Sequence, residues 1–147
     1  DTRKLLYVTY EAQEPVKIYF DDEIAEIYNG LDAVFPNEWV SVVTRDKERN
    51  KMVIRVSSPS NPGDYYFYNR QASQLIPLYT YAPWIDRKIM AETIPVKYTA
   101  RDGLVIPAYL TLTKKKTDKN YMIVLPHGGP NTKQRIGFDW WTQFFAF

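Results

Sequence analysis

Cysteine is absent from the 147-residue sequence, and histidine occurs once, as His127. Without cysteine, disulfide frameworks, thiolate metal sites and cysteine nucleophiles are excluded. A zinc site would have to rely on carboxylates, because only one histidine is present and no His-Glu-x-x-His spacing occurs. We therefore expect neither a metal ion nor a cofactor.

Long apolar runs and an excess of charge of one sign are also missing. No apolar run approaches the ~18 residues that a transmembrane helix needs, and residues 1–4 lack the apolar core of a signal peptide. Nineteen Lys and Arg against seventeen Asp and Glu give a net charge of +2, too balanced to indicate nucleic acid or a membrane as partner. We expect a soluble protein, cytoplasmic or periplasmic, and the sequence does not indicate its oligomeric state.

Aromatic residues are abundant, at 16% of the chain, and they favour β-structure. After two short strands within residues 5–20, the sequence predicts four strands, separated by polar or Pro-Gly-containing turns. Residues 38–79 have the length of one β-propeller blade, about 40–45 residues. A propeller blade buries its apolar faces against neighbouring blades, so a single blade is not expected to be stable alone. We therefore expect residues 1–80 to be the last blade or blades of a propeller. The four predicted strands are Glu38–Arg45, Met52–Ser57, Tyr65–Asn69 and Gln74–Tyr79.

The segment between the two short strands and these four strands has helical periodicity. Asp21 or Asp22 can cap a helix whose positive N-terminus suits Glu23, and Pro36 ends it. Apolar residues that share one face support this helix: Ile24, Ile27, Tyr28, Leu31, Val34 and Phe35.

A second β-rich unit is expected over residues 81–147. Asp102-Gly103 marks a hairpin between strands at Ile94–Ala100 and Leu104–Thr113. Tyr121–Leu125 is a continuous apolar run, which is typical of a strand buried on both faces of an α/β sheet. A final apolar helix capped by Asp139 has no C-terminal signal, so we interpret the chain as a fragment cut at both ends.

The chemistry of the sequence concentrates in His127-Gly128-Gly129-Pro130, directly after the apolar run. In an α/β-hydrolase, the loop after the third strand contributes one backbone N–H to the oxyanion hole. Glycine suits this position because no Cβ stands between the N–H and the substrate. Since Pro130 has no N–H, the donor must be Gly128 or Gly129. A plain turn that closes a strand is the alternative interpretation.

Four motifs occur in this second half of the sequence: Pro95–Leu104, Ala108–Leu112, Leu125–Pro130 and Gly137–Trp140 with Gln143-Phe144. Together they resemble the prolyl oligopeptidase family of serine peptidases, with the greatest likeness to its acylaminoacyl-peptidase and dipeptidyl-aminopeptidase-like branch. In that family a β-propeller precedes an α/β-hydrolase domain. The resemblance implies that the Gly129 N–H completes the oxyanion hole, that Gly128 supports the loop conformation, and that His127 helps to hold the loop without being the catalytic base.

The family's nucleophile lies in a Gly-x-Ser-x-Gly turn, which none of the five serines provides. The catalytic acid and histidine follow the nucleophile in this fold, so we expect these 147 residues to be inactive without the missing C-terminal part of the same protein. The parent protein is predicted to be a serine peptidase acting on short peptides. The five serines are Ser41 in a strand, Ser57, Ser58 and Ser60 in a Pro-containing loop, and Ser73 in a turn.

Two other functions remain open at this stage. A β-rich interaction module without catalysis could present exposed tyrosines to a partner, and Tyr65–Tyr68 is its best support. An esterase or lipase would share the hydrolase half but would not be expected to carry the propeller blade.

Overall fold

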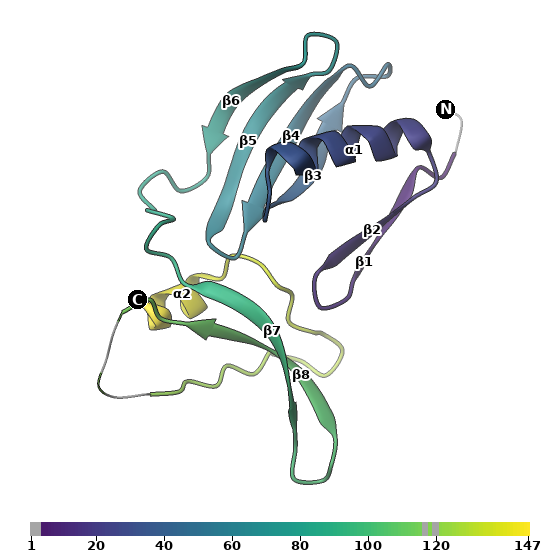
Figure 1. Ribbon diagram of the computed structural model, residues 1–147. Coiled ribbons are helices and arrows are strands. Elements are labelled where there is room, and N and C mark those ends of the chain that lie inside the picture. Colours follow the sequence, from purple (N-terminus) through teal and green to yellow (C-terminus); the bar gives the residue numbers. More distant parts are fainter. Residues whose placement is uncertain (1–3, 116–117, 119–120) are drawn as a thin grey trace.

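The computed structural model describes residues 4–115, 118 and 121–147 (Figure 1). Within these residues the protein is dominated by β-structure, with antiparallel sheets and two helices. In chain order the elements are β1 (Tyr7–Glu11), β2 (Pro15–Tyr19), α1 (Asp22–Val34), β3 (Trp39–Arg45), β4 (Lys51–Ser58), β5 (Asn61–Asn69), β6 (Gln74–Thr80), β7 (Glu92–Thr99), β8 (Val105–Leu112) and α2 (Trp140–Ala146).

The four strands predicted within residues 38–79 are confirmed, and they form one antiparallel sheet in the order β3-β4-β5-β6. The turn between the second and third strands, predicted over Ser58–Asp64, is present but shorter. Strand β4 runs to Ser58 and β5 begins at Asn61, so Ser57 and Ser58 belong to a strand and only two residues connect the strands. Pro62 and Gly63 indicated a turn because both are rare inside strands.

Side chains keep this Pro-Gly segment extended. The Asn61 side chain accepts a hydrogen bond from the Gly63 N–H at 2.9 Å, and Arg55 Nη2 donates to the Pro62 carbonyl at 2.7 Å. Gly63 has a φ of 142°, and a Cβ there would lie 2.9 Å from Arg55 Nε. Glycine therefore makes room for the guanidinium that anchors the start of β5.

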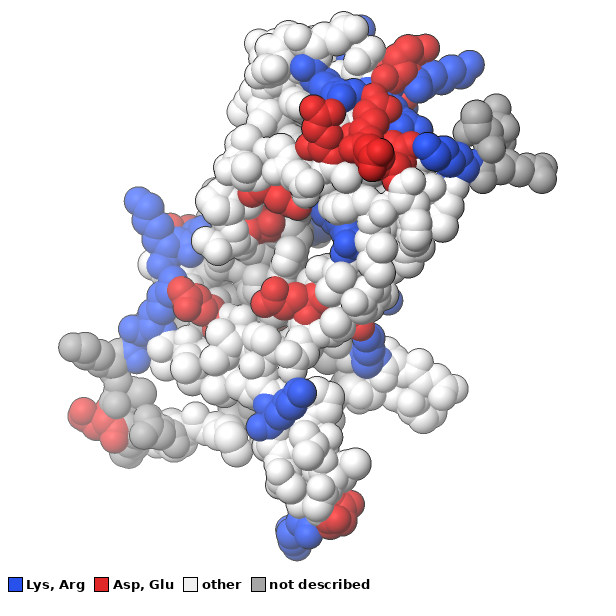
Figure 2. All heavy atoms as spheres, turned by 45° about the vertical axis from the view of Figure 1, so that its right-hand side comes forward, with Lys and Arg blue, Asp and Glu red and all other residues white. Residues whose placement is uncertain are grey.

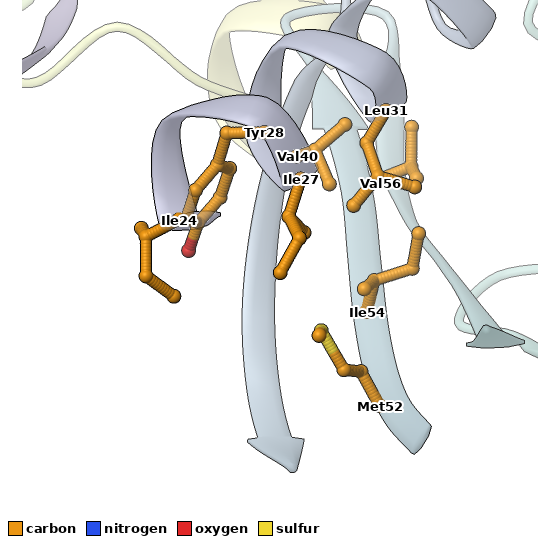
Figure 3. Close-up of a cluster of buried hydrophobic side chains, with 8 residues drawn as sticks. All are labelled: Ile24, Ile27, Tyr28, Leu31, Val40, Met52, Ile54 and Val56. Carbon is orange, nitrogen blue, oxygen red and sulfur yellow. The ribbon is translucent and has the colours of Figure 1, made fainter. Parts of the chain in front are cut away.

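Helix α1 lies across β3 and β4 and closes the main core (Figure 1). Its predicted cap is confirmed, because the Asp21 side chain accepts from the Ile24 N–H at 3.1 Å. The predicted apolar face is confirmed except at its end, where Val34 is exposed. The ring of Phe35 packs against that of Tyr66, with centroids 5.1 Å apart and planes tilted by 47°. The core consists of Ile24, Ile27, Tyr28, Leu31, Val40, Met52, Ile54 and Val56 (Figure 3).

The β1–β2 hairpin is held to α1 and β3 by polar and aromatic contacts. Lys17 Nζ donates to the Val40 carbonyl at 2.7 Å and lies 4.0 Å from the centroid of the Tyr28 ring. Burial lowers the pKa of Lys17, although the negative charge of Asp32 opposes this shift. Burial, with Asp32 and Tyr7, raises the pKa of Tyr19 to about 12. Tyr19 therefore stays neutral at physiological pH.

Acidic and basic side chains gather at one end of the molecule, where α1 begins (Figure 2). Glu23 pairs with both Arg49, at 2.8 Å, and Arg70, at 2.5 Å. Arg49 also reaches Asp21 at 3.1 Å, and Lys4 pairs with Asp21 at 2.7 Å. The pKa of Asp21 is lowered, first by the hydrogen bond from Lys4 and then by the Ile24 N–H. The network joins the start of α1 to the β3–β4 and β5–β6 turns.

The hairpin predicted at Asp102-Gly103 is confirmed as the turn between β7 and β8. Gly103 has a φ of 87°, a conformation that glycine adopts without strain. The Ala100 N–H donates to the Leu104 carbonyl at 2.8 Å, and the Leu104 N–H donates to Asp102 Oδ1 at 3.1 Å.

The buried strand predicted at Tyr121–Leu125 is wrong for this structure. The segment has no regular secondary structure and its side chains are exposed, with Tyr121 at 82% and Met122 at 83%. A strand of a parallel sheet needs neighbours on both sides, and no described segment pairs with it. The three sheets do not close into a propeller within the described residues, and the boundary near residue 80 stays a prediction.

Candidate functional site

The predicted oxyanion loop, His127–Pro130, lies at the surface between the irregular segment 121–126 and the approach to α2. Gly129 has a φ of 75°, in the left-handed region where side chains are disfavoured. Gly128 has no positive φ, and a Cβ there would have no neighbour within 4 Å. Of the two glycines, only Gly129 has a backbone conformation that favours glycine.

The amide of Gly129 is a candidate donor. Among the described residues, no acceptor forms a hydrogen bond with its N–H. An exposed N–H without a protein partner is free to meet a ligand oxygen. The predicted roles of Gly129 and Gly128 stay predictions, because no substrate oxygen marks the site.

Among the described residues, the polar contact of His127 lies inside the loop, where Nδ1 is 3.5 Å from the Gly128 carbonyl oxygen. This separation is at the outer limit of a hydrogen bond. The imidazole is exposed and does not bond to another element within the described residues. Its predicted role in holding the loop stays a prediction.

The chain downstream of the loop is anchored to the rest of the protein. Ile136 is buried, and Lys133 Nζ donates to the Glu11 carbonyl at 2.5 Å. Helix α2 begins with the predicted cap, in which Asp139 Oδ1 accepts from the Thr142 N–H at 2.7 Å. The predicted final helix is therefore confirmed, and its position is determined by contacts described next.

Gln143 is a buried polar residue of α2, and the sequence indicated it only as part of a resemblance motif, without a role. Its Nε2 donates to the carbonyls of Ala91, at 2.9 Å, and Pro59, at 3.0 Å, and its Oε1 accepts from the Ala91 N–H at 2.9 Å. One polar amide inside the aromatic stretch from Trp140 to Phe147 is the signal that could have identified it.

A second buried contact missed by sequence reasoning joins Asp64 of β5 to Arg87. Asp64 is 6% exposed, and its Oδ1 has no hydrogen-bond partner within the described residues. The pair attaches the connection between β6 and β7 to the four-stranded sheet. The sequence could not predict this pair, because Asp64 lies in a strand and Arg87 lies 23 positions later in a loop, so no periodic pattern relates the two charges.

An open hollow of about 240 Å³ lies near the start of α2. It holds a guanidinium and aromatic rings but no serine, histidine or carboxylate, and it does not include the 127–130 loop. The hollow therefore does not contain the predicted oxyanion site. Its lining residues are Arg55, Pro62, Tyr65, Tyr81, Phe138 and Trp140.

The tyrosines that best supported an interaction module are not free. Tyr66 and Tyr68 pack against the main core, and Tyr65 lies against Tyr79 with ring centroids 6.0 Å apart. All four residues of Tyr65–Tyr68 are half-buried, so this run is explained by sheet packing.

Two kinds of feature were not found in the part of the chain that the structure describes. It contains no group of three or more His, Asp or Glu side chains placed to hold a metal ion. None of its helices combines the length and apolarity required to cross a membrane.

Comparison with known proteins relates the chain to peptidases. No family model matches it, and no solved structure does. It is 29% identical over 124 residues to dipeptidyl aminopeptidase BIII of Pseudoxanthomonas mexicana, covering 79% of this chain and 18% of that protein. It is 24% identical over 159 residues to dipeptidyl peptidase family member 6 of Caenorhabditis elegans, covering 93% of this chain and 22% of that protein. The chain thus spans about a fifth of the length of these relatives, and it is distantly related to proteins named as dipeptidyl peptidases.

Proposed function

We propose that the chain is part of a serine peptidase with a β-propeller and an α/β-hydrolase domain. The four-stranded sheet β3–β6 is one blade of the propeller, and residues 81–147 are the start of the catalytic domain. The observation that carries this proposal is the left-handed Gly129 in an exposed loop, with its N–H free of described acceptors, in a chain related to two dipeptidyl peptidases.

In the proposed reaction, a serine attacks the scissile carbonyl, a histidine takes its proton and later gives it to the leaving amine, and an acid orients the histidine. The carbonyl oxygen becomes an oxyanion and accepts a hydrogen bond from the Gly129 N–H. Such a donor contributes about 3–4 kcal/mol of transition-state stabilisation. The nucleophile, acid and base come from a part of the protein other than these 147 residues, because no Gly-x-Ser-x-Gly sequence occurs here.

The substrates proposed are short peptides from which the enzyme removes N-terminal dipeptides. This choice follows the names of the two relatives. In this proposal the chain supplies one hydrogen-bond donor of the oxyanion hole, and no residue of the chain is assigned to recognition of the peptide's first residues.

The test uses the full-length protein with dipeptidyl-p-nitroanilide substrates and a fluorophosphonate that labels activated serines. We expect hydrolysis, labelling, and loss of hydrolysis in proportion to labelling. The 147-residue chain should not label. A full-length protein that neither labels nor hydrolyses these substrates would refute the proposed function.

A further inference from the structure

Gln143 is 5% exposed and lies on the side of α2 that faces the connection before β7. Its neighbours in the helix are largely exposed aromatic residues, including Trp141 and Phe144. A buried amide is retained where its polar groups have partners, since an unpaired one is costly. Here both the carbonyl and the amino group of the side chain are used.

The three hydrogen bonds join segments that are far apart in the sequence. Pro59 lies in the turn between β4 and β5, 84 residues before Gln143, and Ala91 lies just before β7, 52 residues before it. One side chain therefore fixes α2 against both the four-stranded sheet and the connection. Figure 1 shows α2 below the end of this sheet and beside the start of β7.

The connection is itself held at a second point. Arg87 pairs with the buried Asp64 of β5, four residues before Ala91. The connection therefore cannot move away from the sheet without breaking the ion pair between the half-exposed Arg87 and the buried Asp64, and Gln143 attaches α2 to that restrained segment.

The glycine loop lacks comparable restraints on its upstream side. Residues 121–126 are exposed and outside any described strand, and His127 bonds no other described element. Within the described structure, the contacts that restrain this part of the chain lie downstream of Gly129: the hydrogen bond from Lys133 to the Glu11 carbonyl, the buried Ile136, and α2.

We propose that Gln143 is a positioning residue for the oxyanion-hole amide of Gly129, through its fixation of α2 against the sheet. This inference rests on the proposed function. In this proposal the contact between α2 and the four-stranded sheet contributes to catalysis. It keeps the Gly129 N–H where it can donate to the carbonyl oxygen of the substrate. A displacement of about 1 Å from a site remote from the chemistry can cost a hundredfold in rate.

The experiment compares Gln143→Met with wild type in the full-length protein. Methionine has a similar length and suits a helix, but it removes all three hydrogen bonds. Gln74→Met is the matched control, because Gln74 is exposed in β6 and makes no described side-chain contact with α2. The readouts are kcat and KM for a dipeptidyl-p-nitroanilide, the rate of fluorophosphonate labelling, and the thermal midpoint.

For Gln143→Met we expect kcat and the labelling rate to fall by about tenfold to a hundredfold with KM within about twofold of wild type. The control should match wild type in all readouts. A lower thermal midpoint with unchanged kcat, measured well below that midpoint, would assign Gln143 a purely structural role and overturn the inference.

Gln143→Glu replaces Gln143→Met if the latter does not fold. In this buried site beside two carbonyl oxygens the glutamic acid is expected to be protonated, so that it keeps an acceptor for the Ala91 N–H and one donor, and the same two outcomes apply. An active wild type with an unaffected variant refutes this inference alone. A wild type that neither labels nor hydrolyses refutes the proposed function, and this inference with it.

Discussion

Replacement of Gly129 by valine in the full-length protein tests the proposed oxyanion donor directly. Gly129 has a φ of 75°, and leaving a β-branched residue in this region costs about 1–2 kcal/mol. This cost comes from the backbone conformation and not from a steric clash, because a Cβ would meet only Thr132 Cγ2, at 3.7 Å. Valine instead relieves the strain by rotating the adjacent peptide units, which turns the N–H away from its present direction.

The expected loss of transition-state stabilisation is that caused by removing one oxyanion-hole donor. Removing such a donor costs about 2.7–4 kcal/mol, or two to three powers of ten in kcat. The effect should fall on kcat and leave KM little changed, because the donor meets the oxyanion only in the transition state. The thermal midpoint should stay close to that of wild type, since residues 127–130 are exposed and make few contacts.

Two further glycines provide controls for this variant. Gly137→Ala should leave kcat unchanged, because Gly137 has no positive φ and a Cβ there has no neighbour within 4 Å. Gly128→Ala should reduce kcat by less than about tenfold, since it alters the loop without removing the left-handed residue. An unchanged kcat for Gly129→Val in a folded protein would remove Gly129 from the mechanism, and an equal loss in Gly137→Ala would show that the segment is sensitive to any substitution.

Two other predictions concern stability. Leu31→Ala empties a buried position between α1 and the sheet, and it should lower the free energy of unfolding in urea by about 3–5 kcal/mol. The same substitution at the exposed Leu78 should change the free energy of unfolding little. Equal effects of the two substitutions would contradict the assigned core. The lowered pKa of Asp21 means that its contribution to stability is present above its unfolded pKa of about 3.9 and is lost as the pH falls through the lower folded value. Asp21→Asn should therefore lower the thermal midpoint at pH 7 and reduce its dependence on pH below about pH 4, and an acid dependence identical to that of wild type would refute this assignment.

The parts of the fold that the sequence predicted correctly are those with local causes. Helix α1 follows from a cap at Asp21 and an apolar stripe ending before Pro36, all within one short segment. The β7–β8 hairpin follows from Asp102-Gly103, whose glycine takes the positive φ that the turn needs. Neighbouring residues suffice for both predictions.

The start of β5 and the role of Gln143 depend on distant partners instead. Pro62-Gly63 has the composition of a turn, but Arg55 on the adjacent strand keeps the segment extended. Gln143 finds its partners at Ala91 and Pro59, and no periodicity within α2 encodes them. For the candidate site, the sequence left the donor open between Gly128 and Gly129, and only the family resemblance implied Gly129. The structure adds that Gly129 alone of the two has a positive φ, and its role as donor stays a prediction. The contacts of the chain downstream of the loop could be seen only in the structure.

The incorrect strand at Tyr121–Leu125 bears on the site, because this run leads directly into the glycine loop. Full burial of a Val, Leu or Ile side chain is worth about 1.5–3 kcal/mol, yet Ile123, Val124 and Leu125 are all exposed here. The buried apolar residues of α1 and β4 find partners within the described residues, whereas those of this run do not. On the proposed function, we expect these exposed side chains to be covered by a part of the protein outside these 147 residues. Gly129 would then be held from two sides, by that contact upstream and by Gln143 downstream, so that loss of either should misplace the same N–H.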